Sequence, residues 1–221
     1  MAASGPTAAD FVTRLDGLRA EHAPNAVPMR PLFDLAKSLM AMPTPEIEAL
    51  LGRSDHESRV GAVSVMDFQA RAKKTTGDQR AQIYDLYVRR HDLIDTWDLV
   101  DRAAPHVLGG YLAGRPRDQL YVFARSAAPM ERRTAIVATW FFIRTGDLDD
   151  TFAIAELLAH DPDELVQKAV GGWVREAGKR DEARLRAYLD AFAPTMPRTA
   201  LRDAVEKLPP ETRTHYLGLR G

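Results

Sequence analysis

The stretch Asp95–Asp101 carries the residue types in this chain that are best suited to chemistry. It reads Asp-Thr-Trp-Asp-Leu-Val-Asp, within a segment whose apolar spacing predicts a helix. Trp97 and Asp101 are four residues apart, so on a helix their side chains share one face, one turn apart. An aromatic plane beside a carboxylate predicts a reactive site. The alternatives are core packing of Trp97 and ion pairing of Asp101 with Arg102 or Arg133.

The elements that must position this pair are helices. Apolar residues recur at helical spacing from Ala8 onward, and alternating β-branched runs are absent. Pro105 falls inside one predicted helix, so we expect a kink or a split there. The predicted helices cover 8–22, 29–40, 44–53, 55–74, 77–91, 95–113, 116–126, 129–145, 148–160, 162–179, 181–192, 197–207 and 209–218.

Four of these helices share a register in which a small residue is followed by a branched one. The small residues are Ala62, Ala135, Ala169 and Ala204, separated by 73 (135−62), 34 (169−135) and 35 (204−169) residues. Because 73 is about two periods, a missing unit should fall near residue 98. Helix pairs at this period predict an all-α fold, a solenoid of about six HEAT-like helical pairs with a concave groove. An ordinary helical bundle is the alternative. We expect one domain over 1–221, with residues 1–7 disordered.

Composition narrows the function classes. The formal net charge of the 221 residues is −1, so the overall charge does not indicate a nucleic-acid partner. The absence of cysteine excludes disulfides, thiolate metal sites and a cysteine nucleophile. No apolar run approaches the roughly 20 residues that span a bilayer. The N-terminal residues lack the pattern of a signal peptide, so we expect a cytoplasmic protein that binds no membrane.

Basic residues are unevenly placed along the repeats. Acids gather in segments such as Asp147–Asp150 and Asp161–Glu164, between the repeated helices. The cations on the repeated helices would line the concave face, where they suit a phosphate backbone. For any single cation, a solvated helix face is the alternative. These cations are Arg132, Arg133, Lys168, Arg175, Lys179, Arg198 and Arg202.

Three motifs, in order on successive repeats, carry a family resemblance. They are Trp97–Asp101, Glu131–Ile136 and Lys168–Glu176. With them, the sequence resembles the AlkD-type DNA alkylation repair glycosylases from about Asn25 to Leu217. The resemblance implies a groove that binds duplex DNA containing alkylated bases, and hydrolysis of the glycosidic bond of N3- or N7-alkylpurines.

The resemblance also implies roles for single residues. Asp101 would be the catalytic carboxylate, Trp97 would contact the sugar-phosphate at the lesion, and Arg133 would hold a phosphate. No metal or cofactor is implied, and we expect a monomer. The remaining predicted DNA contacts are Trp173, Lys168, Arg175 and Arg202.

One departure from the family pattern concerns the second tryptophan. The family has one glycine before it, whereas this chain has Gly171-Gly172-Trp173. One residue is about 100° around a helix. We expect that Trp173 reaches the groove through a local distortion; the alternative places Gly172 there and Trp173 in the core.

The residues support the chemistry that the resemblance implies. A purine alkylated at N3 or N7 carries positive charge and leaves readily, so the need is to stabilise the oxocarbenium-like sugar. One fixed carboxylate, Asp101, can do this and can orient water. A non-catalytic HEAT module that binds DNA or a protein is the competing hypothesis.

Overall fold

The computed structural model describes residues 5–219, and these fold as helices joined by turns, without strands. The chain divides into two compact units, Met1–Tyr111 and Leu112–Gly221. The expectation of one domain over 1–221 stays a prediction. Of the segment expected to be disordered, residues 1–4 lie outside the described residues, and Thr7 caps the first helix with its side chain. No helix in the described range is long and apolar enough to cross a membrane.

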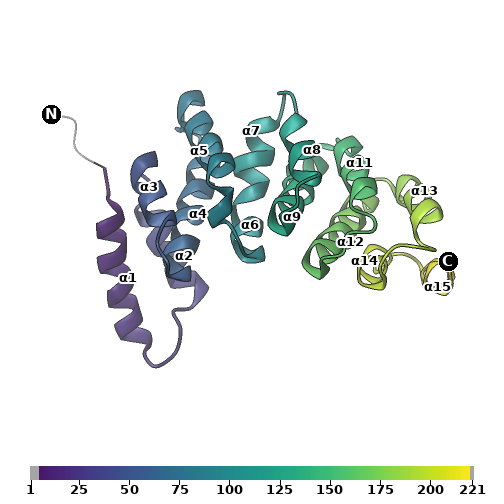
Figure 1. Cartoon of the computed structure of the whole chain (residues 1–221), viewed down its shortest axis with the longest axis horizontal. Helices are drawn as coiled ribbons and strands as arrows, with labels where there is room; N and C mark the ends of the chain where they lie inside the picture. The colour runs from purple at the N-terminus through teal and green to yellow at the C-terminus, as the bar shows by residue number, and fades with distance from the viewer. Residues whose placement is uncertain (1–4, 220–221) are drawn as a thin grey trace. The chain divides into compact units, whose positions relative to one another are not determined.

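Short turns and loops connect consecutive helices along the chain (Figure 1). In chain order they are α1 (Ala8–His22), α2 (Met29–Ser38), α3 (Thr44–Leu51), α4 (His56–Arg71), α5 (Gly77–Arg89), η1 (His91–Leu93), α6 (Trp97–Ala104), η2 (Pro105–Gly109), α7 (Gly110–Leu112), α8 (Asp118–Ala124), α9 (Pro129–Ala138), α10 (Trp140–Thr145), α11 (Asp149–Leu157), α12 (Glu164–Gly178), α13 (Glu182–Phe192), α14 (Arg198–Ala204) and α15 (Pro210–Gly218).

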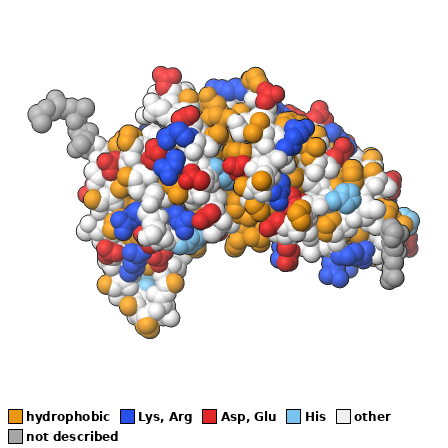
Figure 2. All heavy atoms as spheres, in the orientation of Figure 1, with side chains coloured by type: hydrophobic (Ala, Val, Ile, Leu, Met, Phe, Trp, Pro, Cys, Tyr) orange, Lys and Arg blue, Asp and Glu red, His pale blue; other side chains and the backbone are white. Residues whose placement is uncertain are grey.

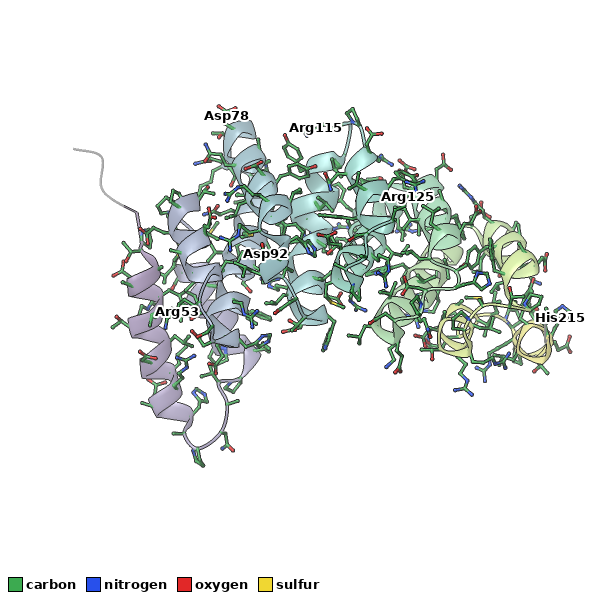
Figure 3. The ribbon with its side chains drawn as sticks, in the orientation of Figure 1. Arg53, Asp78, Asp92, Arg115, Arg125 and His215 are labelled. Carbon is green, nitrogen blue, oxygen red and sulfur yellow. The ribbon has the colours of Figure 1, made fainter. Side chains whose placement is uncertain are left out.

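In the first unit, α2, α4 and α6 form one layer, and α3 and α5 pack against α4. The central helix is α4, which is buried over most of its length, including Val60, Val63 and Met66. Its start is fixed by Asp55, whose Oδ1 accepts the Ser58 N–H at 3.0 Å and a bond from Arg19 at 2.7 Å. Arg53, labelled in Figure 3, donates to the other carboxylate oxygen. This cap sets where α4 begins and therefore which of its residues face α6.

Pro105 interrupts the helix predicted over 95–113. The α-helical turns of α6 stop at Ala104, and residues Pro105–Gly109 form a π-helical turn before α7. Proline has no N–H to donate to the preceding turn, and its ring crowds the carbonyl four residues back, so the ladder must rearrange. The predicted irregularity at this position is confirmed.

In the second unit, α9, α12 and α14 form one layer, and α8, α11 and α13 pack against it. The prediction of one helix over 129–145 is wrong, since α9 and α10 are separate helices that meet at Thr139. The Thr139 hydroxyl donates to the carbonyl of Ile136 at 2.7 Å, a bond that competes with the helical ladder.

The repeat register corresponds to one layer in each unit. Ala62, Ala135, Ala169 and Ala204 lie on α4, α9, α12 and α14, and all four are buried. The missing unit near residue 98 is α6. Small residues at these positions let neighbouring helices approach closely. The predicted all-α, solenoid-like fold is confirmed; the concave groove stays a prediction.

Candidate functional site

Trp97 is the first residue of α6, and 51% of it is exposed. The opposite side of the helix is apolar and buried, through Leu99, Val100 and Ala103. An exposed tryptophan contributes little to the core, because its large apolar surface stays in water. The alternative in which Trp97 is a core residue is therefore wrong.

Asp101 lies one helical turn after Trp97 and is half-buried. Both residues belong to the first unit and share one stripe of α6, as the four-residue spacing predicts. The neighbouring Arg102 is directed to α4, where its Nη1 lies 2.8 Å from a carboxylate oxygen of Asp67. The structure thus places an aromatic surface and a carboxylate side by side on one helix.

A seam of polar contacts joins α6 and the residues before it to α4. His56 Nε2 lies 2.8 Å from Asp98 Oδ2. Nearby, Arg59 Nη1 donates to Asp95 Oδ1 at 2.7 Å. The residues that flank Trp97 are therefore tied to the start of α4.

The centre of this seam is Asp67, which is only 1% exposed. Its Oδ2 lies 2.8 Å from Arg102 Nη1 and 3.3 Å from Arg71 Nη1. Its Oδ1 lies 2.9 Å from His106 Nδ1, on the π-helical turn. Sequence analysis did not identify Asp67. The available signal was a lone acid directly after the mostly apolar run of α4, because a buried carboxylate requires partners.

Arg102 is enclosed on its other sides as well. Its guanidinium lies 4.5 Å from the ring centre of Phe33 and 4.7 Å from that of Phe68, both cation–π contacts. Its Nε donates to the Ser64 hydroxyl at 3.0 Å. Burial lowers the pKa of Arg102, an effect that the charge of Asp67 opposes. The Arg102 side chain therefore contacts a carboxylate, a hydroxyl and two aromatic rings.

The second unit contains the other predicted site residues. Arg133 is 7% exposed and donates to the backbone carbonyl of Leu165, at the start of α12. Its neighbour Arg132 donates two hydrogen bonds to the Asp161 carboxylate, at 2.6 and 3.1 Å. Both arginines of this motif therefore make contacts inside the unit, which solvated side chains would not make.

Three predicted DNA-contacting cations of this unit lie on α12 and α14. Lys168 is exposed and pairs with Glu164 one turn earlier at 2.8 Å. Arg175 pairs with Glu206. Arg202 is exposed, and no ion pair to it is found within residues 5–219. Figure 2 shows Lys and Arg side chains gathered near α14. Lys168 and Arg202 are the predicted contacts most open to an anion.

The two glycines before Trp173 have different surroundings. A Cβ on Gly171 would lie 2.3 Å from the carbonyl oxygen of Ala200 on α14, whereas nothing lies within 4 Å of a Cβ on Gly172. Gly171 is therefore the close-approach position between α12 and α14, and Gly172 lies on an open side of α12. The helix is unbroken through Trp173, which is half-buried. A groove position for Trp173 stays a prediction.

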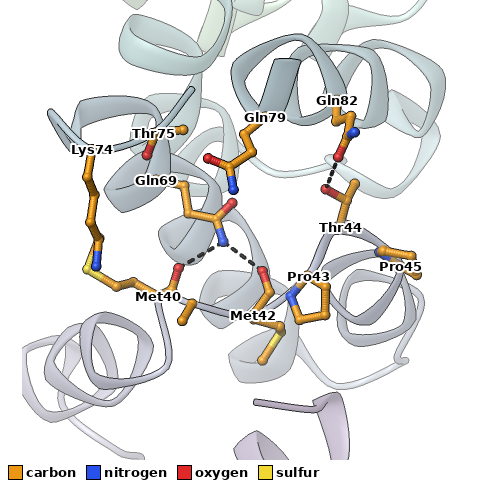
Figure 4. A pocket seen from close by; sticks show the side chains of 11 residues that line it. Met40, Met42, Pro43, Thr44, Pro45, Gln69, Lys74, Thr75, Gln79 and Gln82 are labelled. Carbon is orange, nitrogen blue, oxygen red and sulfur yellow. Dashed lines mark hydrogen bonds between the residues drawn. The ribbon is translucent and has the colours of Figure 1, made fainter. Parts of the chain in front are cut away.

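A cavity of about 410 Å³ lies elsewhere in the first unit (Figure 4). It is bordered by the connection from α2 to α3, the end of α4 and the start of α5. Gln69 Nε2 donates to the carbonyls of Met40 at 2.8 Å and Met42 at 2.7 Å along its edge. None of the predicted site residues lines it. Within residues 5–219, no group of three or more acidic or histidine side chains could hold a metal ion.

No curated protein matches the chain. A family model described as "DNA alkylation repair enzyme" matches residues 24–208, a range that includes α6, α9, α12 and α14. That range is most of the chain and contains every predicted site residue. The chain therefore belongs to the DNA alkylation repair enzyme family and acts in the repair of alkylated DNA.

Proposed function

We propose that this protein is a DNA glycosylase that hydrolyses the N-glycosidic bond of cationic N3- and N7-alkylpurines in duplex DNA. The observation that carries the proposal is the pair Trp97 and Asp101 on α6, with Trp97 51% exposed. An exposed aromatic surface beside a half-buried carboxylate is not required by the packing of the helix. It suits a substrate with an apolar ring and a developing positive charge.

In the proposed reaction, the bond between C1′ and N9 of the alkylated purine breaks, and N9 keeps the electron pair. Because the purine begins as a cation, it leaves as a neutral base and needs no strong general acid. The Asp101 carboxylate stabilises the positive charge that develops on the deoxyribose and orients the water that forms the new C1′–O bond. Trp97 provides a flat contact for the sugar or, by cation–π attraction, for the charged base.

The predicted DNA contacts of the second unit form the other part of the proposal. Lys168 and Arg202 are exposed cations suited to phosphates, and Arg175 is half-buried on the same helix as Lys168. Arg133, which donates to the Leu165 carbonyl, would hold a phosphate. Trp173 would contact DNA from α12.

The test is release of N7-methylguanine and N3-methyladenine from methylated duplex DNA. We expect Asp101→Asn to lower the rate by about 100-fold or more, because removing one group that stabilises transition-state charge has about this effect. Asp85→Asn is the matched control, since Asp85 is a largely exposed residue on α5. If the wild-type protein releases both bases no faster than Asp101→Asn, the catalytic proposal fails.

The second candidate function is a DNA-binding module without catalytic activity. The exposed cations of α12 and α14 favour it, because binding phosphates does not require Asp101. It predicts duplex binding that weakens steeply with salt, without base release. A protein scaffold predicts no DNA binding at low salt. The monomeric state and the cytoplasmic location stay predictions.

A further inference from the structure

The orientation of α6 is not set by its own backbone. The helix has eight residues, and Thr96 at its start makes no side-chain capping bond. Its end passes into the π-helical turn at Pro105. Helices this short depend on tertiary contacts for their stability and their direction. The contacts with α4 must therefore fix how α6 lies.

Three side chains at four-residue spacing make those contacts. Asp98 lies against His56, and Arg102 and His106 both lie against Asp67. Asp98 and Arg102, four residues apart on α6, lie on one stripe of that helix, and His106 follows on the π-helical turn. Hydrogen bonds such as the one between His56 and Asp98 are directional, whereas apolar contacts are not. This stripe is the part of α6 that can fix its rotation about its own axis.

Asp67 joins two of the three contacts in one buried group. Its Oδ2 lies 2.8 Å from Arg102 Nη1, and its Oδ1, which accepts no hydrogen bond within residues 5–219, lies 2.9 Å from His106 Nδ1, so Asp67 contacts both α6 and the π-helical turn that follows. We propose that Asp67 is a positioning residue: through Arg102 and His106 it fixes the rotation of α6 and, with it, the place of the Asp101 carboxylate. This inference rests on the proposed glycosylase function.

The geometry of a helix gives the size of the effect. Side chains lie about 5–6 Å from a helix axis, so a rotation of about 10° moves a carboxylate by about 1 Å. A displacement of about 1 Å at a reacting centre can cost about 100-fold in rate. Because Asp101 precedes Arg102 directly, a rotation allowed by loss of the Arg102 contact displaces Asp101 by the same angle.

The experiment compares Asp67→Asn with wild type in single-turnover base release and in duplex binding. We expect the release rate to fall by about 10- to 100-fold, with a duplex Kd within about twofold of wild type. Glu48→Gln is the matched control, because Glu48 also accepts bonds from two arginines, Arg89 and Arg90, but joins α3 to α5. Combined with Asp101→Asn, Asp67→Asn should cause no further loss, since there is no carboxylate left to position.

A second readout does not depend on catalysis. With Trp140→Phe and Trp173→Phe as background, Trp97 is the remaining tryptophan, and iodide quenching reports its exposure. We expect Asp67→Asn to change the quenching of Trp97 and Glu48→Gln to leave it unchanged. An inactive wild type would refute the glycosylase, while quenching would still decide the positioning role.

The positioning role is overturned if folded Asp67→Asn keeps both the wild-type release rate and the wild-type quenching, or if Glu48→Gln changes both equally. If Asp67→Asn does not fold, Arg102→Lys is judged by the same criteria. Lysine keeps the charge but cannot donate to Asp67 and Ser64 together while lying flat between Phe33 and Phe68.

Discussion

Alanine at Gly171 and at Gly172 should change stability in opposite directions, although the two glycines are neighbours on α12. At Gly171 the new Cβ would lie 2.3 Å from the Ala200 carbonyl oxygen and 2.8 Å from the Cβ of Asp203. A carbon and a carbonyl oxygen normally approach to about 3.3 Å, so α12 and α14 would have to separate by about 1 Å. The Ala200 carbonyl oxygen belongs to the backbone, so it cannot move away by changing a side-chain rotamer.

The expected magnitudes follow from two opposing effects. Overpacking of this kind costs about 1–3 kcal/mol, and contact with backbone favours the upper end. Alanine in place of glycine in a helix contributes about 1 kcal/mol of stability. Gly171→Ala should therefore be net destabilising by about 2 kcal/mol. Gly172→Ala, whose Cβ meets nothing within 4 Å, should be stabilising by about 1 kcal/mol.

The pair is its own control, because the helix-propensity gain is common to both variants and cancels in their difference. That difference, about 3 kcal/mol, measures the clash alone. Urea unfolding gives it from the midpoints, provided the slopes agree with wild type. In a protein of this size, thermal midpoints should differ by about 6–12 °C. Equal midpoints, or a less stable Gly172→Ala, would refute the assignment of Gly171 as the packed position.

Two further predictions concern the first unit. Trp97→Ala should change the free energy of unfolding by less than about 0.5 kcal/mol, because Trp97 is 51% exposed, yet it should slow base release; a large loss of stability in denaturant unfolding would contradict the exposed position. Bonds from Arg89 and Arg90 lower the pKa of Glu48 to about 2. The ionised Glu48 carboxylate therefore stabilises the folded state above the unfolded-state pKa near 4.5, and this stabilisation is lost as the pH falls toward 2. The difference in thermal midpoint between wild type and Glu48→Gln should accordingly be constant above about pH 5 and shrink below it, whereas a difference that grows on acidification would show the opposite linkage.

The fold could be predicted from sequence because its signals are local. Apolar spacing and proline positions located most helices to within a few residues, and Pro105 marked the irregular turn in α6. The break at Thr139 was missed, since it depends on one side-chain bond to a carbonyl three residues back, which the same sequence need not make in another helix.

The site could be predicted only where its residues are close in sequence. The spacing of Trp97 and Asp101 places both on one stripe of a helix wherever that helix packs. The contacts of Asp67 with Arg102 and His106 join residues more than 30 positions apart, and periodicity does not show which side chains meet at such distances. The exposure of Trp97 likewise depends on what its neighbours leave open.

The two hydrogen bonds of Gln69 restrict local unfolding of the connection between α2 and α3 in the first unit. One amide nitrogen on α4 donates to two carbonyls of the connection between α2 and α3, those of Met40 and Met42. The connection can open only when both bonds break together, so its local unfolding is coupled to α4. Amide exchange there should follow the opening of α4. The helix that carries Asp67 therefore also holds the connection between α2 and α3.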